Sequence, residues 1–140
     1  MIKREDIVGY KKNNSFKGIV LKNILEFLSQ KIGFNLVKSP GKRANKIAID
    51  SSLDSEADKI THKLMEEDAK MKSAPLEGKI IKPLYLFLDE EILLYAKIKK
   101  LKFKKIKEKK DKISSFIDEL EKKHPEVKRA IVNSILELYP

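Results

Sequence analysis

The sequence predicts an α/β domain with a small parallel sheet, and three observations lead to this prediction. Apolar residues recur with the helical period of 3.6 residues in several stretches, most clearly at 16–32. Short apolar runs at 46–50 and 84–88 have the length of buried strands. These runs alternate with the helical stretches, and strands separated by helices pair in parallel through right-handed crossovers. We therefore expect one α/β domain spanning residues 1–140.

The N-terminal third begins with an extended or irregular segment at residues 1–14. The first helix is expected at 16–32, where the apolar positions form one broad face, and Gly33 is expected to end it. Proline, glycine and asparagine then predict a loop at 38–45.

The middle of the chain carries the first predicted strand, at 46–50, which reads KIAID. A helix is expected from 54 to about 72, and Asp54 is the residue predicted to cap its N-terminus. Pro75 and Gly78 mark the break that follows this helix.

The last part is predicted to hold the strand at 84–88 and three helices. The first helix runs from Asp89 to about residue 101, with acidic residues in its first turn, where the helix dipole favours negative charge. The two C-terminal helices are expected at 113–123 and 126–138, and they are separated at Pro125.

This arrangement leaves the predicted sheet incomplete. Two strands form a poor parallel sheet, because such sheets need cover on both faces and protection at both edges. We therefore expect one of two solutions: residues 1–12 add a strand, or a second chain completes the sheet, as a partner or by dimerisation.

The charge is unevenly distributed. The formal net charge is +10, and residues 97–112 hold ten lysines against Glu108 and Asp111. Such a cluster suits phosphate backbones or an acidic partner, although a solvated helix face would also produce it. Phe103 is the only aromatic residue within 97–112, so we expect this segment to contact phosphates rather than stack on bases. The candidate nucleic-acid-binding residues are Lys97, Lys99, Lys100, Lys102, Lys104, Lys105, Lys107, Lys109, Lys110 and Lys112.

Composition excludes several kinds of site. The chain has no cysteine, which excludes disulfides, thiolate catalysis and cysteine-ligated zinc or iron–sulfur centres. His62 and His124 are too few to predict a metal site, and no nucleophile with an activating base is recognisable. No apolar run approaches the roughly 20 residues that cross a bilayer. We expect a cytoplasmic protein without a metal or cofactor.

Three blocks of the sequence together resemble the TtuA-type tRNA thiolation enzymes, a family of PP-loop ATPases. The segment at 14–25, NSFKGIVLKNIL, is similar to the family's C-x-x-C-G-x-x-K-R block, with Gly18 retained and Lys22 beside the position of the family's lysine. The segment at 46–60 is similar to a strand followed by G-H-N-x-D-D-E-A, in which Asp54 matches an aspartate that the family uses near the nucleotide. The third block comprises KIIKPLYLFLDEEILLYA and, at 117–126, IDELEKKHPE.

The chain also departs from the family. Asn14 and Lys17 stand where two cluster-ligating cysteines would be, and no cysteine lies near Lys105, where the family has its third. The SGGxDS phosphate loop, the first strand of the nucleotide-binding half and the zinc knuckles are all absent from the sequence. The resemblance thus implies a truncated half of a PP-loop (HUP-type) fold that retains Gly18, Lys22 and Asp54.

The function that the resemblance implies is a non-catalytic one. We expect a thiolase-like pseudoenzyme that binds tRNA or serves as a partner subunit in tRNA sulfur modification, together with a full-length thiolase or with its own copy. The alternative is a protein-interaction or dimerisation module without a role in RNA binding. An enzyme that uses a nucleotide through Asp54 and Lys22 is a third, less favoured hypothesis, because the phosphate loop is missing.

Overall fold

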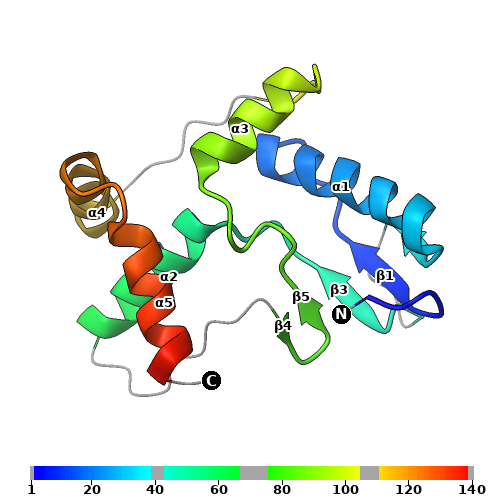
Figure 1. Cartoon of the computed structure of the whole chain (residues 1–140), viewed down its shortest axis with the longest axis horizontal. Coiled ribbons are helices and arrows are strands. Elements are labelled where there is room, and N and C mark those ends of the chain that lie inside the picture. Colours follow the sequence, from blue (N-terminus) through cyan, green and yellow to red (C-terminus); the bar gives the residue numbers. More distant parts are fainter. Residues whose placement is uncertain (1, 39–42, 67–75, 105–110, 139–140) are drawn as a thin grey trace.

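The structure is a computed structural model that describes residues 2–38, 43–66, 76–104 and 111–138. Its strands are β1 (Ile7–Tyr10), β2 (Asn35–Val37), β3 (Lys46–Ala48), β4 (Leu76–Glu77) and β5 (Ile80–Ile81). Its helices are α1 (Phe16–Ile32), α2 (Leu53–Met65), α3 (Asp89–Ile98), α4 (Lys112–Lys123) and α5 (Val127–Leu138). The predicted α/β class is confirmed, and Figure 1 shows the arrangement of the elements.

The sheet has the strand order β2-β1-β3-β5-β4. The first four of these strands are parallel, and β4 adds an antiparallel edge. The central strand β1 comes from the N-terminal segment, so the expectation that residues 1–12 add a strand is confirmed. The chain itself supplies the neighbours of β3 that a second chain would otherwise have to provide.

The predicted strand at 84–88 is wrong. β3 pairs in parallel with β5, a few residues earlier in the sequence, and the segment that follows β5 forms turns. In these turns the amide of Tyr85 donates to the carbonyl of Lys82, and that of Phe87 donates to Leu84. The apolar run is explained by burial in two directions, because Leu84 packs in one hydrophobic cluster and Tyr85 in the other.

The two clusters divide the molecule. In the larger one, α1 and α3 cover a face of the sheet, with Val8, Tyr10, Leu25 and Ile92 among its buried residues. In the smaller one, α2 packs against α5. Figure 1 shows α1 and α3 together above the sheet, whereas α2, α4 and α5 form a group beside it.

The predicted helix at 16–32 matches α1 at both ends. Ser15 caps its N-terminus by accepting a hydrogen bond from the amide of Gly18, and Gly33 ends it with a φ of 91°, in the left-handed region that glycine adopts readily. The predicted cap at Asp54 is wrong, since Ser52 caps α2 by accepting from the amide of Ser55. Within the described residues, no helix is long and apolar enough to cross a membrane.

Candidate nucleic-acid interface

The sheet reverses its winding direction between β1 and β3. From β1 the chain crosses to β2 on one side, and it then returns to β3 on the other side of β1. In open α/β sheets, ligands bind in the crevice outside the carboxyl ends of the strands at such a point. Here the crevice contains a cavity of about 450 Å³. Its lining comes from the segments after β1 and β3 and includes Lys11, Lys12, Asn13 and Asp50.

The loop between β1 and α1, residues 11–15, has a defined geometry. The side-chain oxygen of Asn13 accepts a hydrogen bond from the amide of Ser15 at 2.8 Å, and its Nδ2 lies 3.4 Å from an oxygen of Asp50. A Cβ atom on Gly18 would lie 2.6 Å from the Cβ and carbonyl oxygen of Asn13. Gly18, matched to a family glycine by the sequence, therefore has a structural role here: it permits the loop to approach α1 closely.

The beginning of the lysine-rich segment is attached to this loop. The amide of Lys104 donates to the carbonyl of Asn14 at 2.8 Å, and the ring of Phe103 packs edge-on against Phe16, with 6.2 Å between centroids. Lys100 adopts a φ of 54° at the end of α3, where the chain leaves the helix. Two lysine-bearing segments that are far apart in the sequence therefore meet.

We call the lysines of these two segments the cationic edge: Lys11, Lys12, Lys102 and Lys104. All four side chains are exposed. Between residues 101 and 104, Leu101 and Phe103 pack against the larger hydrophobic cluster, and the lysines alternate with them toward solvent. Lys11 and Lys12 are not among the lysines predicted from the sequence. Their position as a pair directly after an apolar strand could have identified them as candidates.

The other predicted lysines lie near the ends of α3 and α4 or outside the described residues. Lys97, Lys99 and Lys100 are exposed around the C-terminal end of α3, and Lys112 is the first residue of α4. Lys105, Lys107, Lys109 and Lys110 lie outside the described residues. Phe103, the aromatic residue of the lysine-rich segment, packs against Phe16.

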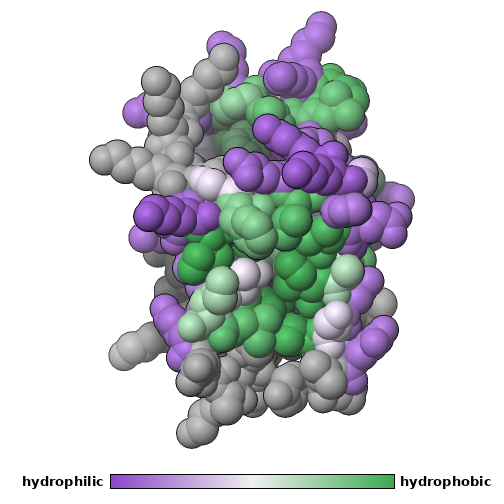
Figure 2. All heavy atoms as spheres, turned by 90° about the vertical axis from the view of Figure 1, so that its left-hand side faces the viewer, coloured by the Kyte–Doolittle hydropathy of each residue, from purple (hydrophilic) through white to green (hydrophobic). Residues whose placement is uncertain are grey.

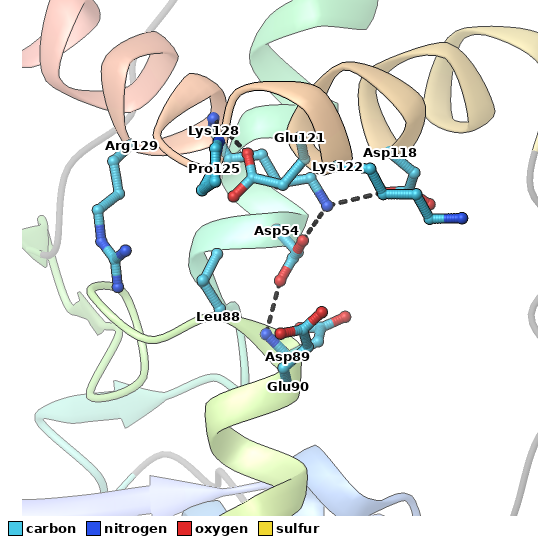
Figure 3. A pocket seen from close by; sticks show the side chains of 10 residues that line it. All are labelled: Asp54, Leu88, Asp89, Glu90, Asp118, Glu121, Lys122, Pro125, Lys128 and Arg129. Carbon is cyan, nitrogen blue, oxygen red and sulfur yellow. Dashed lines mark hydrogen bonds and ion pairs between the residues drawn. The ribbon is translucent and has the colours of Figure 1, made fainter.

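Asp54, the second residue matched to the family, is occupied by contacts within the chain. One of its oxygens accepts a hydrogen bond from the amide of Asp89, the first residue of α3, at 2.6 Å. The other oxygen binds the ammonium group of Lys128, which also lies 2.7 Å from an oxygen of Asp118 (Figure 3). Asp54 thus connects the start of α2 to the start of α3 and to α5.

These side chains line a cavity of about 650 Å³ between α2, α3, α4 and α5. Burial alone would lower the pKa of Lys128, but its hydrogen bonds to Asp118 and Asp54 outweigh burial and raise it above the ordinary value. A permanently charged lysine therefore fills the position that a bound cation would take between the two carboxylates. Lys22, the third matched residue, pairs with Glu26 at 3.9 Å. Lys22 and Asp54 do not share a partner in the described contacts.

The N-cap position of α3 is Leu88, and Asp89 is the first residue of the helix. Its carboxylate accepts a hydrogen bond from the hydroxyl of Ser52 at 2.5 Å and lies 3.6 Å from the ammonium group of Lys17. At this helix start, the side chain of Glu91 accepts instead from the amide of Leu88 at 3.1 Å. The carboxyl end of the sheet therefore contains negative as well as positive groups.

A buried ion pair that the sequence analysis did not anticipate lies near the same end of the sheet. The ammonium group of Lys82, directly after β5, is 2.8 Å from a carboxylate oxygen of Glu56, and both side chains are at most 2% exposed. Ser51 donates a hydrogen bond of 2.6 Å to the same oxygen of Glu56. In the sequence, the position of Lys82 inside the apolar run IIKPLYL could have indicated that its side chain is buried.

Comparisons with known proteins place this geometry in a structural context. The fold is similar to that of a tRNA thiolase. The matching structure is the U34-tRNA thiolase NcsA from Methanococcus maripaludis with its 4Fe–4S cluster, at a TM-score of 0.73 and 17% sequence identity. The match covers 97% of this chain and 72% of NcsA. No protein-family model matches the chain, and a search of curated proteins found no match.

The similarity to NcsA shows a shared fold and agrees with the resemblance found in the sequence. The structural match extends over 97% of the chain, further than the blocks that carry the resemblance in the sequence. The chain has no cysteine, so cysteine thiolates cannot bind a cluster in it.

Proposed function

We propose that this protein binds tRNA through phosphate contacts along the cationic edge and acts without catalysis, as a partner subunit in tRNA sulfur modification. The observation that carries the proposal is the hydrogen bond from Lys104 to Asn14, which joins the lysine-rich segment to the loop after β1. Lysines held next to one another on a fixed surface can neutralise several phosphates of one backbone, and this term dominates the affinity of non-specific nucleic-acid binding.

The non-catalytic part of the proposal has separate support. The SGGxDS phosphate loop of the family is absent from the sequence. Asp54, the retained carboxylate, is bound by Lys128 and by the amide of Asp89. A nucleotide-dependent reaction at Asp54 would first have to displace these internal partners, which also hold α3 and α5 in place.

The partner in this proposal is a full-length thiolase or a second copy of this chain. The fold similarity to NcsA, which is described as a U34-tRNA thiolase, motivates the choice of tRNA over other polyanions. The basic character of the chain, with a net charge of +10, favours binding to an acidic molecule such as tRNA.

The test is the salt dependence of tRNA binding, measured by fluorescence anisotropy with a labelled tRNA. If the four lysines of the cationic edge contact phosphates, the logarithm of the association constant should fall against the logarithm of salt concentration with a slope of about −3 to −4. Absence of tRNA binding at low salt would overturn the proposal. Isothermal titration with ATP and magnesium tests the second part, and tight binding would contradict a role without a nucleotide.

A second candidate is a protein-interaction module without a role in RNA binding. Figure 2 shows apolar side chains gathered on the face formed by α2, α4 and α5, bordered by hydrophilic ones. Leu64 and Met65 of α2 and Phe116 of α4 are each more than half exposed. Contiguous exposed apolar surface is typical of interaction sites. A protein that shows no tRNA affinity but loses a protein partner on the substitution Phe116→Glu would favour this candidate.

A further inference from the structure

A second apolar surface lies between α1 and α3, away from the face formed by α2, α4 and α5. A groove of about 370 Å³ separates the outer sides of these two helices. Its walls are almost entirely apolar, with Val20 and Ile24 from α1 and with Phe87, Leu94 and Ile98 from α3 and the segment before it. The side chains of Phe87, Leu94 and Ile98 are 46%, 57% and 68% exposed, an unusual exposure for three large apolar residues on one groove.

Three of these residues form a short apolar row. Leu94 and Ile98 lie four residues apart on α3, which places them on one side of the helix, and Phe87 lines the same groove from the segment before the helix. Ile92, which also lines the groove, and Ala96 are buried in the larger hydrophobic cluster, so this part of α3 is already packed. The side chains of the apolar row stay exposed in the described part of the chain.

The charges along α3 have a direction. The helix begins with Asp89, Glu90 and Glu91, whereas its C-terminal end carries Lys97, followed by Lys99 and Lys100. Glu90 and Lys97 are exposed and seven residues apart, so they occupy equivalent positions two turns apart, beside the apolar row. An acidic partner would match only the lysine end of this surface, and a basic partner would match only the acidic end.

We propose that the occupant of this groove is a second copy of the chain, bound with its α3 antiparallel to the first. A two-fold axis near Leu94 would place Leu94 against its own copy and would place Glu90 of each copy opposite Lys97 of the other. Such an interface is self-complementary in charge, which a two-fold symmetric dimer requires, because the same surface contributes both sides. The groove beside α1 then receives the exposed side chains of the second copy's α3.

This dimer does not depend on tRNA binding, and it is tested without RNA. Sedimentation velocity over a concentration series should show the wild-type protein passing from monomer to dimer. The substitutions Glu90→Lys and Lys97→Glu should each weaken dimerisation by at least tenfold, because each creates two like-charge contacts across the interface. Both side chains are exposed, so we expect little effect on folding, which thermal melting checks.

The decisive experiment mixes the two variants and tests whether they pair with each other. The lysine introduced at position 90 of one variant would face the glutamate introduced at position 97 of the other, and the remaining wild-type residues would also meet with opposite charge, so the mixture should form a heterodimer. Native mass spectrometry with one variant labelled with ¹⁵N identifies it. Leu94→Glu should abolish dimerisation, and Phe116→Glu is the control on the other apolar face. A monomeric wild type, failure of the mixture to pair, or a dimer dissolved only by Phe116→Glu would each overturn the proposal.

Discussion

At the scale of single residues, the buried pair of Glu56 and Lys82 makes the sharpest prediction. Replacing Glu56 removes the carboxylate that lies 2.8 Å from the buried ammonium group of Lys82, and breaking a buried ion pair typically costs about 3–5 kcal/mol. Glu56→Gln should therefore lower the free energy of unfolding by about that amount, as measured by urea denaturation. The double variant Glu56→Gln, Lys82→Met should be more stable than Glu56→Gln alone, because it also removes the buried positive charge.

The control for this prediction is Glu119→Gln, an exposed acidic position on α4, where we expect a change within about 0.5 kcal/mol. If Glu56→Gln costs no more than this control, the pair is not buried as described. The apolar neighbours of Lys82 could have indicated a buried lysine, but not its partner, because the two residues come from α2 and from the segment after β5 and only the fold brings them together.

His62 makes a second prediction, concerning pH. Its Nε2 lies 2.5 Å from an oxygen of Asp111, and its Nδ1 lies 2.7 Å from the carbonyl oxygen of Asp58. Both neighbours are acceptors, and only the doubly protonated ring donates to both. The hydrogen bond to Asp111 and then that to Asp58 raise the pKa of His62 above 6.5. The contact between α2 and α4 should therefore be complete below pH 6.5 and weaken as the pH rises through the raised pKa.

The measurement is an NMR titration of the His62 ring, with the stability of the wild type and of His62→Gln followed over the same range. The wild type should lose more stability than the variant between pH 6.5 and the pKa found for the ring. Asp111→Asn keeps a residue type that can cap α4 and should lower the pKa of His62. A ring that titrates at or below 6.5 in the wild type would contradict this account.

At the scale of elements, the sequence predicts helices far better than strands. The helix α1 has a long apolar period, a serine before it and a glycine after it, and its predicted bounds match the structure. The strands contain only two to four residues, which is too short for a recognisable alternation. The apolar run at 84–88 led to a wrong strand prediction. In the structure it contains turns, and Leu84 and Tyr85 are buried in two separate clusters.

The loop between β1 and α1 gives the prediction that belongs to this scale. Gly18→Ala places a methyl group 2.6 Å from atoms of Asn13, so the loop has to move. We expect a loss of about 1–3 kcal/mol in the free energy of unfolding, as for other overpacked sites. Gln30→Ala, at an exposed position of the same helix, is the matched control and should not destabilise the protein appreciably. Equal stability of the two variants would show that Gly18 is not in close contact with the loop.

At the scale of the whole molecule, the candidate interface is only partly readable from the sequence. The lysine-rich segment at 97–112 is evident from composition, but its position beside Lys11 and Lys12 is not. That position depends on a single backbone hydrogen bond and on one pair of aromatic rings between segments about 90 residues apart. Local patterns cannot encode a meeting of this kind, and the separate resemblance of each block to thiolation enzymes did not predict it either.

The central claim is that the cationic edge binds tRNA, and it is tested most directly by comparing two double variants. Lys102→Gln with Lys104→Gln removes half of the edge, whereas Lys31→Gln with Lys123→Gln removes the same charge from the C-terminal ends of α1 and α4. We predict that the first variant weakens tRNA binding and makes the salt dependence shallower by about two units of slope, and that the second leaves the slope nearly unchanged. Equal effects of the two variants would contradict the account, because binding would then follow net charge alone.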